Sequence, residues 1–174
     1  MKSIKHLSFA IVLAVATVLS SCSSDGGSGG SGGVGTLKAK IGGSNFTSIP
    51  QAAMALLATN GIYQNLAISG ADASGKSLQL QILAENIGVG TYQITDQSDI
   101  FSSGTYSEVD VNNPTSAQVW GAPYDGGGNS GSITITAITA TNVTGTFNFT
   151  AQSITGTGSK AITDGSFNLN ITSN

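Results

Sequence analysis

Hydrophobic and polar residues alternate over the run from Ser132 to Ile171, near the end of the chain. Apolar residues occupy every second position in three successive segments, and Thr, Ser and Asn fill most of the positions between them: Ile133–Ile135, Val143–Ala151 and Gly165–Ile171. A period of two, rich in β-branched and aromatic residues, is typical of strands with one buried and one solvated face. Turn residues gather at Thr139–Asn142 and Thr155–Lys160. We therefore predict an antiparallel meander whose apolar face needs a second layer.

Earlier parts of the chain, from about Thr36 onwards, supply that layer with shorter segments of the same kind. Strands are expected at Leu37–Ile41, Asn45–Thr47, Ile62–Gly70, Leu78–Ala84, Val89–Ile94, Gly104–Val109 and Ser116–Trp120. The glycine-rich segment Pro123–Gly131 then leads into the meander. About ten short strands with closely spaced turns predict an all-β domain over residues 36–174, an antiparallel β-sandwich or a flattened barrel.

One segment of this domain is ambiguous. Ala52–Ala58 (AAMALLA) consists of good helix formers, but Asn60-Gly61 follows it directly. Because Asn-Gly between apolar runs is a strong hairpin signal, we favour strand–turn–strand, with a short helix as the alternative.

At four places a glycine stands two residues before a tyrosine or a phenylalanine. The four motifs are Gly90-Thr91-Tyr92, Gly104-Thr105-Tyr106, Gly145-Thr146-Phe147 and Gly165-Ser166-Phe167. A ring can lie across a glycine on its own or the next strand, where it covers bare backbone and fixes the register. These rings are therefore expected to pack inside the domain.

The first residues do not belong to the fold. Lys2 and Lys5 precede the apolar run Phe9–Leu19, which is short for a membrane span, so residues 1–21 are predicted to be an export signal. The following Leu19-Ser20-Ser21-Cys22 resembles a bacterial lipobox. This resemblance implies cleavage before Cys22 and attachment of lipid to that cysteine, with several acyl chains giving a stable membrane anchor. The alternative is an ordinary signal peptide followed by a free thiol.

Residues 22–35 then form a tether. Ser23–Gly35 (SSDGGSGGSGGVG) is a Gly/Ser-rich coil with an r.m.s. span of roughly 20 Å. The expected location is the cell envelope, at the outer membrane. The side of the membrane that the domain faces stays open, because only one acid, Asp25, follows the cysteine closely.

Composition excludes several classes of function. Without residues 1–21 the chain keeps four lysines against nine acidic residues, a formal charge of −5, and it contains neither histidine nor arginine. Nucleic-acid binding is not expected, because phosphate contacts need clustered Lys and Arg. Histidine-based catalytic triads and His/Cys transition-metal sites have no residues to build them. We expect no cofactor and no metal of that kind.

Carboxylate and amide oxygens leave two further possibilities, a glycoside hydrolase pair and a calcium site. Glu108 and Asp110 share one face of a strand, as the paired carboxylates of a glycoside hydrolase do, but acids at a strand end usually serve solubility. Calcium binding stays open, although no loop matches the EF-hand pattern. The candidate oxygen donors are Asp96, Asp99, Glu108, Asp110, Asn112, Asn113 and Asp125.

Aromatic residues near the glycine-rich turn provide the only candidate ligand contacts. Trp120 and Tyr124 flank Gly-Ala-Pro, and Tyr106 is expected nearby. Aromatic faces in polar loops can stack on sugars or seat a peptide. The alternative is that Trp120 covers one end of the core with its N–H hydrogen-bonded.

The order of these features resembles a known family. A lipobox, a Gly/Ser linker and a Gly-Thr-Tyr strand end precede Gly-Ser-Ile-Thr-Ile-Thr, Gly-Thr-Phe-Asn-Phe-Thr-Ala and Ile-Thr-Asp-Gly-Ser-Phe. This pattern is similar to small Bacteroidota lipoproteins that carry a domain of unknown function. The resemblance covers most of Thr36–Ile171, implies the β fold, and carries over no catalytic residue.

These observations favour a non-catalytic envelope lipoprotein, anchored through Cys22, that binds or supports an unidentified glycan or protein partner. The alternative is a carrier of a small apolar ligand in a barrel-like cavity, and a hydrolase comes third. The oligomeric state is left open by the sequence.

Overall fold

A computed structural model describes residues 34–97, 100–110 and 112–173. This part of the chain contains one short 3-10 helix, η2 (Pro50–Ala52), and eleven strands. The strands are β1 (Thr36–Ile41), β2 (Ser44–Thr47), β3 (Met54–Asn60), β4 (Tyr63–Ala71), β5 (Lys76–Ala84), β6 (Gly90–Thr95), β7 (Phe101–Asp110), β8 (Asn113–Ala122), β9 (Asn129–Ile138), β10 (Asn142–Ser153) and β11 (Ser159–Ser173). The all-β class predicted from the alternation of apolar and polar residues is confirmed.

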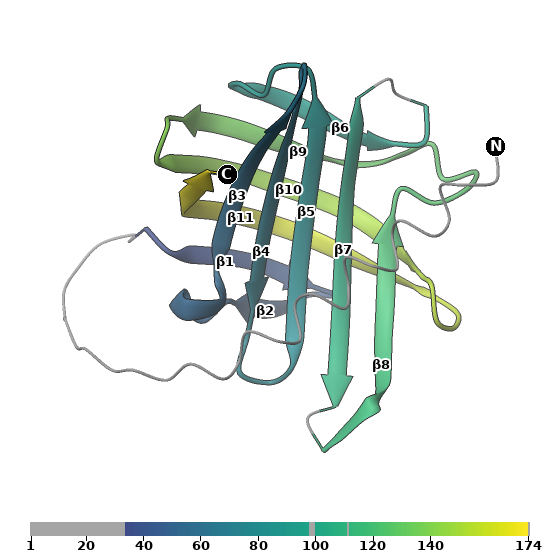
Figure 1. Cartoon of the computed structure of the whole chain (residues 1–174). Coiled ribbons are helices and arrows are strands. Elements are labelled where there is room, and N and C mark those ends of the chain that lie inside the picture. The colour runs from purple at the N-terminus through teal and green to yellow at the C-terminus, as the bar shows by residue number, and fades with distance from the viewer. Residues whose placement is uncertain (1–33, 98–99, 111, 174) are drawn as a thin grey trace. The chain divides into compact units, whose positions relative to one another are not determined.

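The strands form two layers that cross one another (Figure 1). The front layer has the strand order β3-β4-β5-β7-β8. The back layer has the order β2-β1-β11-β10-β9-β6 and contains the predicted meander of β9, β10 and β11. Each layer turns its buried apolar side chains toward the other layer, as the periodicity of the sequence requires.

Two corner pairings join the layers into a single mixed sheet. At one corner the end of β10 pairs with β8, where Gln152 lies opposite Gly121. At the other, the end of β11 pairs with β3, where Ile171 lies opposite Ala55. The result fits the predicted sandwich or flattened barrel.

The expectation of a wholly antiparallel sheet is wrong at the second corner, because β11 and β3 run parallel. The physical reason is that β11, with 15 residues, outruns β1 and β10. Its last residues reach the open edge of β3, and that edge accepts whichever strand passes, in the direction in which it happens to run.

The ambiguous segment is a strand. Ala52 ends η2, β3 begins at Met54, and Asn60 pairs with Tyr63 across a two-residue turn. Gly61 has a φ of 63°, as the first central residue of a type II′ hairpin turn requires. The hairpin signal of Asn60-Gly61 therefore outweighed the helix propensity of the alanines and leucines before it.

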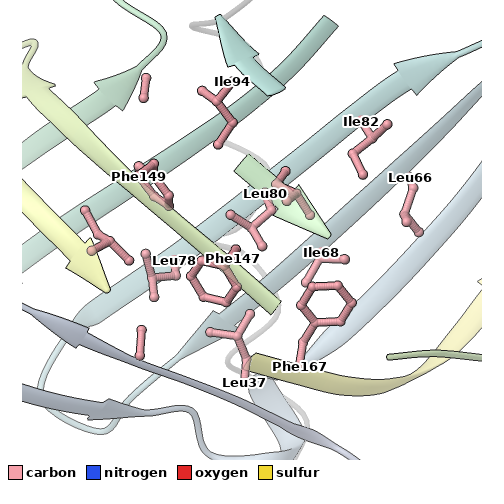
Figure 2. Packing of buried hydrophobic residues seen from close by; sticks show 14 of the residues in the cluster. Leu37, Leu66, Ile68, Leu78, Leu80, Ile82, Ile94, Phe147, Phe149 and Phe167 are labelled. Carbon is pink, nitrogen blue, oxygen red and sulfur yellow. The ribbon is translucent and has the colours of Figure 1, made fainter. Parts of the chain in front are cut away.

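The space between the layers is filled by side chains from the alternating inward positions of both layers (Figure 2). Leucines and isoleucines of the front layer face three phenylalanines of the back layer. The largest contributors include Leu37, Leu66, Ile68, Leu78, Leu80, Ile82, Phe147, Phe149 and Phe167, all at most 3% exposed.

Phenylalanine rings lie across glycines, as the sequence motifs predict for β10 and β11. Phe147 pairs with Gly165, and Phe167 pairs with Gly145. A Cβ at Gly165 would be 2.6 Å from the Phe147 ring, and one at Gly145 would be 2.4 Å from the Phe167 ring. The two glycines thus make room for the two rings and hold β10 and β11 in this register.

Glycines also allow the two layers to approach one another. Phe149, from the back layer, lies over Gly104 of the front layer, where a Cβ would be 2.7 Å from the ring. Gly104 is therefore covered by a ring from the opposite layer and not by Tyr106 of its own motif.

No helix of the described residues has the length and apolar character needed to cross a membrane. The predicted export signal, Cys22 and the linker up to residue 33 lie outside the described residues.

Replacing Gly104 with alanine is expected to lower the free energy of unfolding by about 1–3 kcal/mol, because the methyl group overpacks the Phe149 ring between two layers. The matched control is Gly90→Ala on β6, where an added Cβ meets nothing within 4 Å. Urea unfolding of both variants measures the difference. Equal stability of the two variants would show that the layers can separate to admit the methyl group.

Candidate functional site

Two of the three aromatic residues singled out in the sequence come together. Tyr106 on β7 and Trp120 on β8 are cross-strand partners. Their rings stack with centroids 5.5 Å apart at an interplanar angle of 28°. Tyr106 is 0% exposed and Trp120 5% exposed, so both rings lie inside the molecule and not on an open stacking surface.

Tyr124 does not join this pair. It lies in the loop between β8 and β9, and its ring covers Gly127, where a Cβ would be 2.5 Å from it. Among the described residues, the ring contacts of Tyr106 and Trp120 do not include Tyr124. The three aromatic residues therefore form no common platform.

A charged pair covers the stacked rings. Lys160, at the start of β11, places its Nζ 3.1 Å from Oε1 of Glu108 on β7. The same Nζ lies 4.7 Å from the centre of the Trp120 ring. Tyr106 donates its hydroxyl hydrogen to Oε1 of Glu108 at 2.6 Å. This network, Glu108–Tyr106–Lys160–Trp120, connects the two layers at one end of the sandwich.

The network shifts the pKa values of its acidic groups. Partial burial raises the pKa of Glu108, but hydrogen bonds from Tyr106 and Lys160 and the charges of Lys160 and Lys76 outweigh burial and bring it below its usual value. Burial first, and then the hydrogen bond to Glu108, raises the pKa of the Tyr106 phenol far above its usual range. Glu108 is thus held as a carboxylate with two donors, and Tyr106 is held as a neutral phenol.

The arrangement supports a structural role for Glu108. Its neighbour in the sequence pattern, Asp110, instead accepts the backbone N–H of Asn112 at 2.9 Å, and the β7–β8 register shifts between the two acids. No group of three or more His, Cys, Asp or Glu side chains able to hold a metal ion occurs within the described ranges. Asp99, one of the candidate oxygen donors, lies outside the described residues, and calcium binding stays a hypothesis.

Beside the network lies a shallow polar depression of about 350 Å³. It lies between β8 and the β10–β11 turn. Hydroxyl groups and an amide form most of its lining. The lining residues are Ser116, Ala117, Gln118, Ser153, Thr155, Gly156 and Thr157.

The outer face of the front layer is the feature that sequence reasoning missed. Outward positions of β3, β4, β5 and β7 expose large apolar side chains in neighbouring rows: Leu83 pairs with Phe101, and Leu56 is two residues from Met54 on β3. We call this surface the apolar face. Its exposed members are Met54 (53%), Leu56 (38%), Tyr63 (49%), Leu83 (37%) and Phe101 (46%).

Loops at one end of the front layer extend the apolar face. The β3–β4 turn carries Ile62, which is 67% exposed, and the β5–β6 loop carries Val89, which is 69% exposed. A shallow depression of about 430 Å³ opens at this end, lined by Ala58, Asn60, Tyr63, Asn65 and Leu83. Large apolar side chains exposed on one face of a sheet are typical of interaction sites.

One signal in the sequence could have revealed this face. The segment Met54–Leu57 is apolar at consecutive positions, whereas a strand with one solvated face alternates. A strand that is apolar on both sides needs cover on both sides. Because this segment consists of good helix formers, its composition raises the choice between helix and strand and obscures the missing alternation.

Replacing Glu108 with glutamine is expected to lower the free energy of unfolding by about 1 kcal/mol near pH 7, a value discounted for the partial exposure of the pair. Because folding lowers the pKa of Glu108, its contribution is present above the usual glutamate pKa of about 4.3 and is lost as the pH falls through the lowered value. The difference between wild type and variant should therefore shrink in acid.

Urea unfolding between pH 7 and pH 3 measures this difference. Asp125→Asn, at an exposed loop position, changes the charge equally and serves as the control. A destabilisation by Glu108→Gln that is the same at every pH would contradict the electrostatic origin of the effect.

Comparison with known proteins identifies one family. No curated protein and no solved structure matches the chain. A family profile described as "Domain of unknown function (DUF6252)" matches residues 35–169, which include β1 to β10 and most of β11. The chain therefore belongs to the DUF6252 family of domains of unknown function.

Proposed function

We propose that this protein is a non-catalytic, lipid-anchored module of the bacterial cell envelope that binds a protein partner through the apolar face. The observation that carries the proposal is the exposure of Met54, Leu56, Tyr63, Leu83 and Phe101 on adjacent strands. Exposed apolar area costs free energy in water, and covering it by a partner recovers about 25 cal/mol for each Å². A protein partner is preferred to a glycan because the exposed leucines and phenylalanine of the apolar face offer no hydrogen-bonding group to sugar hydroxyls.

The chemistry of the face supports docking. Outward positions of β3, β4, β5 and β7 carry no Asp, Glu, Lys or Arg. Its central polar groups satisfy one another, since Gln81 donates an amide N–H to Oδ1 of Asn65 at 3.2 Å. A partner therefore desolvates little charge when it covers this surface, which favours association.

The carrier hypothesis has less support. A carrier needs an apolar cavity between the layers, whereas Phe147, Phe149 and Phe167 occupy that space and are each at most 3% exposed. The hydrolase hypothesis has no support from Glu108, because that carboxylate is hydrogen-bonded to Tyr106 and paired with Lys160. We therefore retain surface binding as the function.

The anchor follows from the lipobox-like residues before Cys22, and the pattern of motifs supports an outer-membrane lipoprotein of the Bacteroidota. A Gly/Ser tether of roughly 20 Å r.m.s. span gives the domain freedom to turn its apolar face toward a partner in the same membrane plane. Tethering also raises the effective concentration of such a partner.

Replacing Cys22 with serine is expected to abolish lipid attachment. Metabolic labelling with an alkyne fatty acid should mark the wild-type protein and leave the variant unlabelled, and the variant should move from the membrane to the soluble fraction. Ser21→Ala, which keeps a small residue before the cysteine, is the matched control. Equal labelling of wild type and Cys22→Ser would show that the anchor lies elsewhere or is absent.

A photo-crosslinking amino acid at Leu83 is expected to capture a discrete partner in intact cells, because Leu83 is exposed beside Phe101 and lines the depression at the end of the apolar face. The same amino acid at Thr146, an exposed outward position of β10 on the back layer, is the control. Immunoblotting compares the products. Identical products from the two positions, or none from Leu83, would argue against docking on this face.

A further inference from the structure

We infer, on the basis of the proposed function, that the partner is cationic and amphipathic: it presents apolar side chains flanked by Lys or Arg. The inference rests on the distribution of charge around the apolar face. Among the described residues, acids border the end of the face that carries Leu83 and Phe101, and lysines lie elsewhere, so this end combines apolar side chains with negative charge at its edge.

Two exposed acids border the apolar end. Glu85 directly follows β5, two residues beyond Leu83, so it continues the outward row that Leu83 belongs to. Asp96 directly follows β6, in the loop that leads into Phe101 at the start of β7. Both side chains are exposed, Glu85 in the outward row of Leu83 and Asp96 five residues before Phe101 in the chain.

The lysines of the domain cannot neutralise these acids. Lys76 lies at the other end of β5, seven residues from Leu83, which is about 23 Å along an extended strand. That separation exceeds the screening length of about 8 Å at physiological ionic strength. Lys160 is paired with Glu108, and Lys40 is paired with Asp164 at 2.8 Å. Lys38 and Lys40 belong to β1 of the back layer.

This charge distribution disfavours two other occupants. A second copy of the chain, related by two-fold symmetry, would bring the acidic edge of one apolar face close to that of the other. An anionic lipid surface would repel Glu85 and Asp96, and none of the described lysines borders this end to attract it. A partner with basic residues around an apolar stripe matches both the apolar side chains and the acids at this end of the face.

Two synthetic helical peptides provide the test. Both carry leucine at the same amphipathic spacing, one with lysine and the other with glutamate at every polar position. Each is titrated, with fluorescence detection, into the mature protein carrying Cys22→Ser, which is free of acyl chains. We expect the lysine peptide to bind at least ten-fold more tightly than the glutamate peptide, and its affinity to fall as salt rises from 50 to about 500 mM.

Three variants locate the binding. Glu85→Gln combined with Asp96→Asn should weaken the lysine peptide about five-fold and remove most of the salt dependence. Leu83→Gln should weaken both peptides, because it removes apolar contact beside Phe101. Thr146→Gln on the back layer is the matched control and should bind as the wild type does.

The outcomes separate the charge inference from the proposed function. Binding to vesicles that contain anionic phosphatidylglycerol would show that a lipid surface occupies the face and would overturn the cationic partner. Equal binding of the two peptides, with loss in Leu83→Gln, would overturn the cationic partner and leave the docking face standing. Binding that Leu83→Gln does not change would overturn the docking face itself. Failure of the wild type to bind the lysine peptide would overturn the cationic partner, as would concentration-dependent dimers in sedimentation or binding to phosphatidylcholine vesicles.

Discussion

The structure depends on close packing between phenylalanine rings and bare backbone. Phe147 and Phe167 lie over glycines of each other's strand, and Phe149 crosses the gap to cover Gly104. A ring and a glycine together occupy about the room of two ordinary side chains, so this packing brings two crossed layers into contact without gaps. It also specifies the register of β10 and β11, on which the positions of β9, β1 and β6 depend.

Filling the interior with rings leaves only the outer surfaces of the sandwich for contact with other molecules. Because inward positions are taken by packing, the surfaces available to a partner are the two outer faces and the ends of the sandwich. The back layer exposes Thr, Ser and Asn, as at Thr134 and Thr146, which water solvates well. The front layer exposes Leu83 and Phe101 in adjacent positions, so the two faces differ in kind.

The two ends of the front layer differ in how their charged side chains are paired. Glu108 and Lys160 neutralise each other at the end where they cover Tyr106 and Trp120, and their pairing joins the two layers there. At the opposite end, Glu85 lies beside apolar side chains and forms no ion pair with another described residue. One end therefore serves cohesion of the sandwich, and the other has the composition of an interaction surface. In a domain with so few charges, this separation makes each of them count.

The sequence by itself determined the β class and the meander of β9 to β11 through period-two alternation, and the hairpin through Asn60-Gly61. It also determined the ring-over-glycine packing of β10 and β11 through their Gly-x-Phe motifs, because all of these depend on neighbours in the sequence or on single strand faces. Only the tertiary structure decided the parallel pairing of β11 with β3, the burial of Trp120 and the apolar face. Each of these depends on which strands meet across the fold. Leu83 and Phe101 are eighteen residues apart in the sequence and become one surface only because β5 and β7 pair.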